Sequence, residues 1–173
     1  MIFIIIIFLL VLLFLIFFDI ILRRNYLRYK YYNEMKLLSI KNNTPLLVIG
    51  ALDRGSLSSK IGQLLNLTYK HGDFCLDING CSCKNSIKED IYIFLKKQKS
   101  KSFIIFISCV LDYIDNIDLV FKEIKRVSDD NFKIVYINNL IEFNFLGSYY
   151  ENNKFLKRKN RIIKITKNNI IYK

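Results

Sequence analysis

The chain has 173 residues and a formal net charge of +12, which suits one domain of ordinary size beside a targeting segment, and we expect no second domain. Hydrophobic residues make up 52% of the chain. Many of them lie in the first two dozen residues, so the rest of the chain is less hydrophobic than this average. The positive charge would attract phosphate in lipid or in nucleic acid, yet no aromatic and basic recognition module is visible, and we do not expect a nucleic-acid partner.

The first 22 residues are apolar apart from Asp19. At ~1.5 Å per residue, a helix of this length matches a hydrocarbon core of ~30 Å, so the segment is a transmembrane helix or a signal peptide. A cleaved signal has basic residues before the apolar run and a small-residue cleavage site after it, whereas here RRNYLRYKYY follows the run. We therefore predict a transmembrane signal anchor over residues 1–22, with Asp19 near its end, where its carboxylate can reach the membrane interface or lie beside Arg23.

Basic and aromatic residues follow the anchor and set its orientation. No Lys or Arg precedes the apolar run, and several follow it at once, so the positive-inside rule predicts a single-pass protein with its C-terminal domain in the cytoplasm. The expected membrane partner is lipid, contacted through residues 1–32, with anionic headgroups attracted by the basic residues. Residues 23–44 are predicted to form a basic and aromatic juxtamembrane spacer.

Residues 45–173 are predicted to form one α/β domain. Leu46 to Ile49 reads as a short buried strand that ends at Gly50, and a helix with one apolar side begins near Ser56. The sequence then predicts a strand over Phe74 to Ile78, a short third strand near Ile87, and a short helix over Ile91 to Lys97.

A strand, a helix and a second strand follow between Ser102 and Asn138. Phe103 to Ile107 is a continuous apolar run, as in a strand buried on both faces of a parallel sheet. Asp115 or Asn116 can cap a helix whose apolar residues recur at helical spacing from Ile117. These elements form a βαβ unit with a right-handed crossover.

The tail is predicted to end in a hairpin of Arg161 to Thr166 with Ile170 to Tyr172. Strands that alternate with helices before a terminal hairpin indicate an open α/β sheet.

The four cysteines fit a reducing compartment. Cys75 and Cys109 lie in apolar strands, where a free thiol behaves as a small hydrophobic side chain. Cys81 and Cys83 form a C-x-C pair, but a zinc site needs two more ligands and His71 is isolated in the sequence, so we predict no metal. A disulfide is expected only if the domain lies on the other side of the membrane.

The segment IIFISCVLDYIDNIDLVFKEIKRVSDDNFKIVYI resembles the fourth strand, the following helix and the fifth strand of class I S-adenosylmethionine-dependent methyltransferases. The similarity lies in Val110, Leu111, Ile114, Asp115, Glu123, Arg126 and Val127. Upstream, LLVIGALDRGS and CLDIN stand where this family has its first strand with the cofactor loop and its second strand. The resemblance covers roughly residues 45–138 and implies a Rossmann-like open sheet of the methyltransferase type, preceded here by one transmembrane helix.

The resemblance also implies a set of cofactor contacts for S-adenosylmethionine. In an open α/β sheet the ligand lies beyond the carboxyl ends of the strands. Gly50 and Gly55 would let the backbone approach the methionine part, Asp77 would accept hydrogen bonds from the ribose hydroxyls, and Glu89 or Asp90 would face the adenine. Residues 108–111, with Cys109 and Val110, would line the methyl-donor side; no catalytic residue is predicted.

The cofactor loop departs from the family pattern, since Val48 stands where the family has an acidic residue. Its absence either weakens the affinity for the cofactor or means that Asp53 has taken over the contact to the amino group of the cofactor. Each site residue also has a structural alternative: Asp77 as a strand-end carboxylate, Gly50 as a turn glycine, and Asp90 as the cap of the next helix.

Three functions stay open at this point. The chain is a divergent methyltransferase with an unknown acceptor, a catalytically inactive methyltransferase-like domain that acts as a membrane-tethered binding or scaffold protein, or another α/β domain that binds a nucleotide or a partner.

Overall fold

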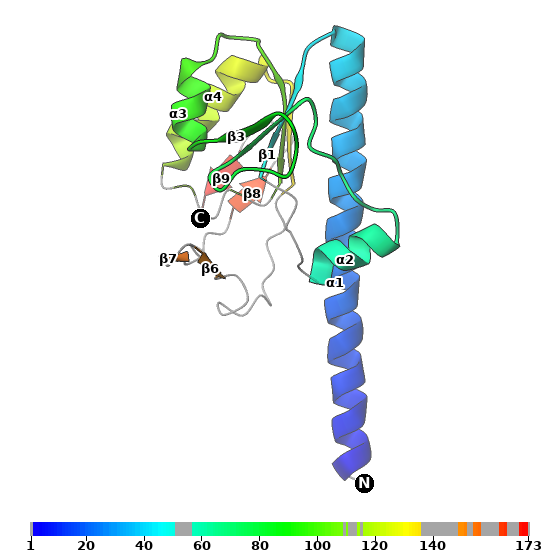
Figure 1. Cartoon of the computed structure of the whole chain (residues 1–173). Helices are drawn as coiled ribbons and strands as arrows, with labels where there is room; N and C mark the ends of the chain where they lie inside the picture. Colours follow the sequence, from blue (N-terminus) through cyan, green and yellow to red (C-terminus); the bar gives the residue numbers. More distant parts are fainter. Residues whose placement is uncertain are drawn as a thin grey trace.

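The computed structural model of this chain describes residues 2–50, 57–108, 110, 114, 116–135, 149–151, 154–156, 163–165 and 170–172. Its described part is a parallel sheet with helices on two sides, from which the N-terminal helix projects (Figure 1). Among the predicted site residues, Asp53, Gly55 and Cys109 lie outside the described residues.

The first element, α1 (Ile2–Asn42), is one helix of 41 residues. Its N-terminal half extends away from the sheet (Figure 1), and every large apolar side chain from Phe3 to Phe17 is exposed. This helix is long and apolar enough to span a membrane. As predicted, Asp19 lies beside Arg23, with a carboxylate oxygen 2.8 Å from the guanidinium Nε.

The second half of α1 is a layer of the α/β domain and not a spacer. Tyr32 and Met35 are buried in one core cluster with side chains of the central strands of the sheet. The Lys133 ammonium of β5 (Phe132–Val135) lies 5.5 Å from the ring centroid of Tyr31, within the range of a cation–π interaction. The aromatic and basic residues that suggested a membrane interface therefore include side chains that pack on the sheet.

The central sheet has five parallel strands in the order β3-β2-β1-β4-β5. Their bounds are β1 (Leu46–Ile49), β2 (Phe74–Asp77), β3 (Ser86–Lys88), β4 (Ile104–Ser108) and β5 (Phe132–Val135). Every residue of β1 and β4 is buried, which confirms the prediction of central strands covered on both faces. The α/β class and the open parallel sheet are thus confirmed.

Alternation along these two strands divides the core between the faces of the sheet. One set of side chains packs with α3 (Ile91–Lys97) and α4 (Ile117–Ser128), and comprises Leu47, Ile49, Ile105 and Ile107. The other set packs with α1, and comprises Leu46, Val48, Ile104 and Phe106. Since a strand presents successive side chains to opposite faces, β1 and β4 join the two halves of the core.

Three aromatic rings fix α1 to its face of the sheet. The Phe106 ring lies edge-on to Tyr32 of α1, with centroids 5.8 Å apart, and edge-on to Tyr69, with centroids 5.3 Å apart. The rings of Tyr32 and Tyr69 are 6.0 Å apart. Such pairs add stability beyond the area that they bury.

The helix α2 (Leu57–Leu64) packs on α1 rather than on the sheet. A side chain at Gly62 would come within 3.2 Å of the Asn25 amide of α1, so the contact depends on a small residue. The predicted helix is confirmed, but its apolar side is not fully buried, because Leu64 is 82% exposed and Leu65 is 43% exposed.

Two antiparallel hairpins are described in the tail. The predicted terminal hairpin is confirmed as β8 (Ile163–Ile165) paired with β9 (Ile170–Tyr172). A second hairpin, β6 (Tyr149–Glu151) with β7 (Lys154–Leu156), was not predicted.

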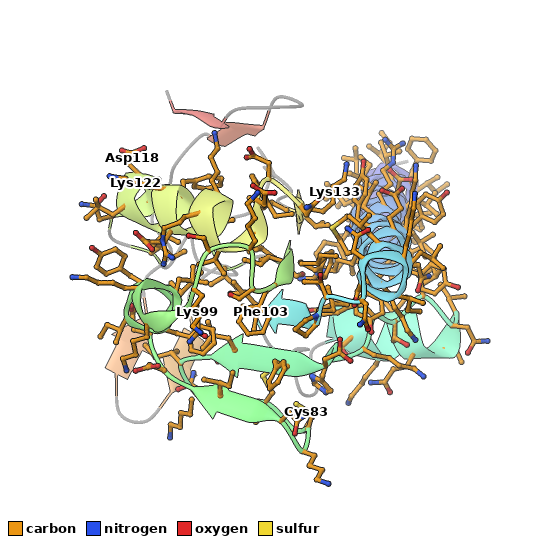
Figure 2. All side chains as sticks on the ribbon, turned by 90° about the horizontal axis from the view of Figure 1, so that it is seen from above. Cys83, Lys99, Phe103, Asp118, Lys122 and Lys133 are labelled. Atoms are coloured by element: carbon orange, nitrogen blue, oxygen red, sulfur yellow. A yellow bond between two sulfur atoms is a disulfide. The ribbon has the colours of Figure 1, made fainter. Side chains whose placement is uncertain are left out.

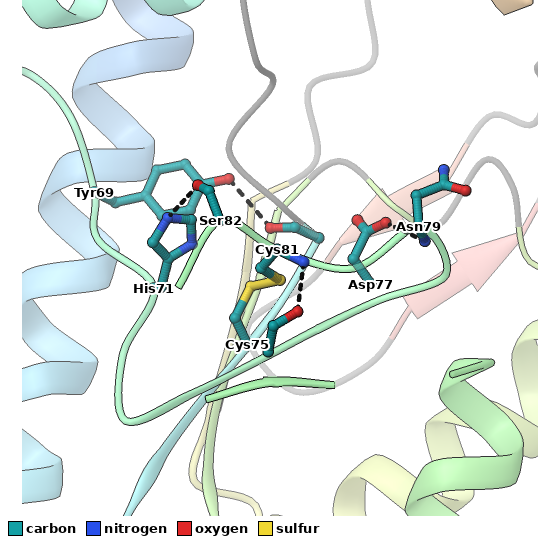
Figure 3. Close-up of a disulfide and its surroundings, with 9 residues drawn as sticks. Tyr69, His71, Cys75, Asp77, Asn79, Cys81 and Ser82 are labelled. Carbon is teal, nitrogen blue, oxygen red and sulfur yellow. Dashed lines mark hydrogen bonds between the residues drawn. A yellow bond between two sulfur atoms is a disulfide. The ribbon is translucent and has the colours of Figure 1, made fainter. Parts of the chain in front are cut away.

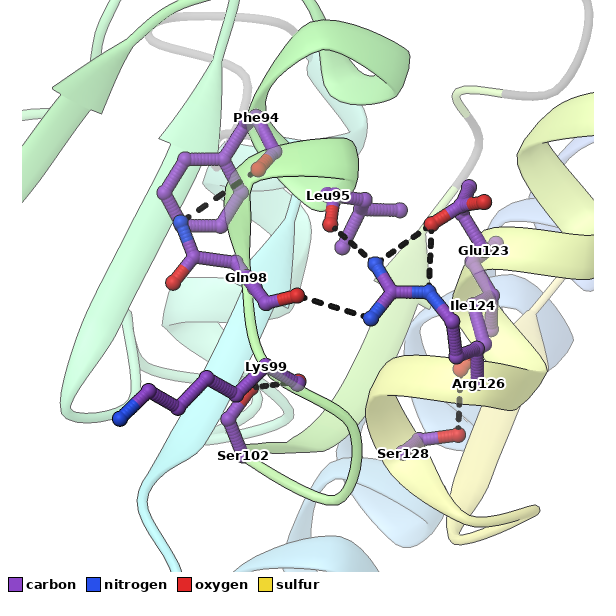
Figure 4. A network of polar contacts seen from close by, with 9 residues as sticks. All are labelled: Phe94, Leu95, Gln98, Lys99, Ser102, Glu123, Ile124, Arg126 and Ser128. Carbon is purple, nitrogen blue, oxygen red and sulfur yellow. Dashed lines mark hydrogen bonds and ion pairs between the residues drawn. The ribbon is translucent and has the colours of Figure 1, made fainter.

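Arg126 of α4 joins the two helices on the far face of the sheet (Figure 4). Its guanidinium donates to the carbonyl oxygens of Leu95 and Gln98 at the end of α3, at 2.9 and 2.8 Å. The Glu123 carboxylate holds the same guanidinium at 2.6 and 2.8 Å. Carbonyls in the last turn of a helix lack partners within the helix, so Arg126 supplies them with donors.

Substituting Arg126 with alanine should lower the free energy of unfolding by about 2 kcal/mol, because hydrogen bonds of a charged donor and the ordering of two helices are lost together. Lysine is the matched variant, and it should recover only part of the loss because a single ammonium cannot reproduce the planar fork. Chemical denaturation in mild detergent, followed by tyrosine fluorescence, measures both. Equal stability of the alanine variant and the wild type would contradict this role.

Candidate functional site

The carboxyl edge of the sheet holds three of the residues that the sequence singled out, Gly50, Asp77 and Val110. The strand β1 lies between β2 and β4, so the chain winds in opposite directions from the middle of the sheet. Open α/β sheets bind ligands outside the carboxyl ends of the strands at such a switch point. Gly50 follows β1, Asp77 ends β2, and Val110 comes two residues after β4.

Gly50 is fixed at this edge by both its backbone and its surroundings. Its φ is +93°, a region that favours glycine. A Cβ atom there would lie 2.4 Å from Val110 Cγ2 and 2.5 Å from the carbonyl oxygen of Ser108. Gly50 N donates to Leu76 O at 3.0 Å. The position therefore requires glycine whether or not a ligand binds.

Asp77 lies on the neighbouring strand, one residue after the pairing of Ile49 with Leu76. Its carboxylate Oδ1 accepts a hydrogen bond from Asn79 N at 2.9 Å (Figure 3), and Gly80 N donates to Asp77 O at 3.0 Å. These bonds orient a half-buried carboxylate at the strand end.

Asp90 has the alternative role that the sequence allowed. It is the N-cap of α3, and its Oδ1 accepts from Tyr92 N at 2.8 Å and from Ile93 N at 3.1 Å. The preceding Glu89 pairs with Lys97. The local structure thus accounts for both acidic residues that were expected near the adenine.

Val110 packs against the core of α3 and α4 and lies directly over Gly50. Phe74 starts β2 and packs edge-on with Phe103, with ring centroids 5.7 Å apart. That contact is at the amino end of the sheet, away from Gly50 and Asp77.

A second group of side chains comes together beside β2. The potential ligand atoms of His71, Cys75, Cys81 and Cys83 all lie within 4.8 Å of one another. Cys75 and Cys81 form a disulfide (Figure 3), so Cys75 is not the free thiol that was expected. A disulfide was expected only on the non-cytoplasmic side, so this bond stands against the predicted orientation. His71 Nε2 and Ser82 Oγ are 3.3 Å apart.

Sequence reasoning missed this cluster because it treated His71 as isolated and Cys75 as a core residue. The signal present in the chain was the spacing H-x₃-C-x₅-C-x-C. That spacing matches no ordinary zinc pattern of paired C-x₂₋₄-C ligands, and only the fold of the β2 to β3 connection brings its members together.

Comparisons with protein-family models, with curated proteins and with solved structures find no match for this chain. The fold that is shown is an open, all-parallel α/β sheet of five strands with one long apolar helix at the N-terminus.

Proposed function

We propose that this chain is a membrane-anchored, methyltransferase-like protein that binds S-adenosylmethionine at the carboxyl edge of its sheet. The observation that carries the proposal is the position of Gly50 and Asp77 on adjacent strands, at the switch point of a sheet in the order β3-β2-β1-β4-β5. This is the order of the first five strands of a dinucleotide-binding fold.

The two residues suit the two parts of such a ligand. A glycine has no side chain to keep a ligand from the backbone; Gly50 itself is buried beneath Val110, so a ligand would have to displace that side chain. A carboxylate that is already held by Asn79 N can accept hydrogen bonds from ribose hydroxyls with little loss of side-chain entropy. The sulfonium of S-adenosylmethionine is already an activated methyl donor. The protein therefore needs to bind and orient the reactants, and it does not need to supply a nucleophile.

The N-terminal helix supports a membrane location for this activity. Its exposed apolar half is long enough to span a bilayer, and the basic residues that follow would place the α/β domain in the cytoplasm. Because α1 continues without a break into the core of the domain, the carboxyl edge of the sheet would keep a fixed height above the membrane. The acceptor would then be a lipid headgroup or another molecule near the membrane.

A second candidate is a methyltransferase-like domain without catalysis that holds a partner at the membrane. Three observations favour it: Val110 lies over Gly50, Asp90 is engaged as a helix cap, and the buried Val48 stands at the position of the acidic residue of the family.

Calorimetric titration with S-adenosylmethionine and S-adenosylhomocysteine tests the proposal. The full chain in lipid nanodiscs is the correct sample, because a fragment that begins near Lys41 would uncover the face of the sheet that α1 covers. The Asp77→Asn variant keeps the size of the side chain and should bind about 10- to 100-fold more weakly, since hydrogen bonds to a charged acceptor are lost.

The matched control is Asp118→Ala, which removes an exposed acid from α4 (Figure 2) and should leave the affinity unchanged. Absence of binding at millimolar ligand by a folded chain would contradict the proposal. If the chain binds S-adenosylmethionine but transfers its methyl group to no membrane-lipid, peptide or small-molecule acceptor, the non-catalytic candidate would be favoured.

A further inference from the structure

The connection between β2 and β3 is unusually short for two parallel strands. It comprises only residues 78–85, between Asp77 and Ser86, whereas crossovers between parallel strands usually take a dozen or more residues and contain a helix. The connection therefore lacks the apolar helix face that would normally fasten it to the sheet.

Polar contacts fold this connection back along β2. Cys81 N donates to Ser86 Oγ at 2.7 Å, and Asn85 Nδ2 donates to Asp73 O at 2.9 Å. Cys75 N donates to Asn85 O at 3.2 Å. These bonds bring Cys81 from the connection to Cys75 of the strand and near His71 in the loop before it (Figure 3). Cys83 joins the same group of potential ligands.

We infer that His71, Cys75, Cys81 and Cys83 form a structural zinc site that fastens the β2 to β3 connection when the cysteines are reduced. Three thiolates and one imidazole are a common ligand set of structural zinc, and soft thiolates select this metal over magnesium or calcium. This inference does not depend on the binding of S-adenosylmethionine.

The geometry requires small movements in both directions: the sulfurs of Cys75 and Cys81, bonded in the disulfide, would move apart on reduction, and the more distant ligand atoms would move together. With Zn–S bonds of ~2.3 Å, two sulfurs of a tetrahedral site lie roughly 3.8 Å apart. The four ligand atoms already lie within 4.8 Å of one another. Cys75 belongs to a buried strand and Cys81 to a hydrogen-bonded loop, so the backbone positions of the site exist before the metal binds.

The disulfide and the zinc site are alternative uses of the same sulfurs. A dithiol reductant would break the bond between Cys75 and Cys81, supply two electrons and two protons to give two thiols, and itself become a disulfide. Zinc would then bind and release one proton from each of the three thiols. In a reducing cytoplasm the zinc form is expected, and in an oxidising compartment the disulfide fastens the connection instead.

The test uses the full chain in detergent, reduced with a phosphine, with four free thiols confirmed by titration. Addition of Zn²⁺ should load one equivalent per chain, and Co²⁺ should give the intense visible bands and the sulfur-to-cobalt charge transfer of a tetrahedral thiolate site. Cys83→Ser should weaken metal binding by more than about 100-fold, since loss of even an outer partner of a ligand costs 10- to 100-fold.

Two further variants make the test specific. Cys83→Ser keeps Cys75 and Cys81, so under oxidation it should still form their disulfide, which shows that it folds. His71→Gln should weaken metal binding as well, whereas Asp118→Ala, which removes an exposed acid from α4, should leave metal binding unchanged. Failure of the reduced, folded chain to bind metal would overturn the inference, and so would binding that is unaffected by Cys83→Ser.

Discussion

Substitution of Phe106 by alanine should lower the free energy of unfolding by about 3–5 kcal/mol, the usual cost of truncating a buried phenylalanine. The Phe106 side chain is fully buried in β4 and contacts the rings of Tyr32 and Tyr69. The loss is a large fraction of the 5–15 kcal/mol that typically stabilises a domain. Chemical denaturation in mild detergent, followed by tyrosine fluorescence because the chain has no tryptophan, measures it.

The matched control for Phe106 is Leu37→Ala on α1. Leu37 is 69% exposed and lies on the side of α1 that faces away from the sheet, so its loss should change stability by less than about 0.5 kcal/mol. A similar effect of both substitutions would mean that α1 does not cover this face of the sheet in the assigned orientation.

Substitution of Gly50 by alanine should destabilise the chain by roughly 2–5 kcal/mol, the sum of a left-handed backbone penalty and of overpacking. The added Cβ would meet Val110 Cγ2 at 2.4 Å and the Ser108 carbonyl oxygen at 2.5 Å. A backbone oxygen in a central strand cannot move aside at low cost. The same denaturation experiment measures the effect.

Gly80→Ala separates the two contributions at Gly50. The φ of Gly80 is +82°, but the nearest atom to its added Cβ would be Ser86 Oγ at 3.4 Å. This variant should therefore show the backbone penalty alone, about 1–2 kcal/mol. Equal losses at Gly50 and Gly80 would show that the close approach of β4 to Gly50 adds nothing.

The elements with strong local signals could be predicted from the sequence. The continuous apolar runs of β1 and β4 can bury all their side chains only if both faces of the sheet are covered. Both strands lie within one residue of their predicted bounds. The helices α3 and α4 begin at residues whose side chains cap them, Asp90 and Asn116. These signals are local, so no long-range contact was needed to interpret them.

The role of the second half of α1 could not be predicted for a physical reason. Its buried side chains include polar ones, such as Ser39, and Tyr32 carries a hydroxyl, so the sequence shows no clean apolar stripe. Tyrosines and basic residues after an apolar span are typical of a membrane interface. Only the packing of these side chains against β4 and β5 distinguishes a helix that covers the sheet from a spacer.

Only part of the candidate site could be predicted from local signals. Gly50 and Asp77 follow predicted strands, and neighbouring strand ends bring them together. The resemblance at Glu123 and Arg126, by contrast, has a structural explanation in the fastening of α3 to α4. The cluster around His71 depends on a connection that folds back over β2, which no spacing rule anticipates.

Hydrogen–deuterium exchange of the full chain in nanodiscs, with and without saturating S-adenosylhomocysteine, tests the central claim most directly because it reports where the ligand binds. We predict slower exchange in the peptides that contain Gly50 and residues 77–80, and unchanged exchange in the peptides of α3 and in residues 149–172. Unchanged exchange at Gly50 and Asp77 in the presence of ligand, or protection confined to other parts of the chain, would contradict a cofactor site at the carboxyl edge of the sheet.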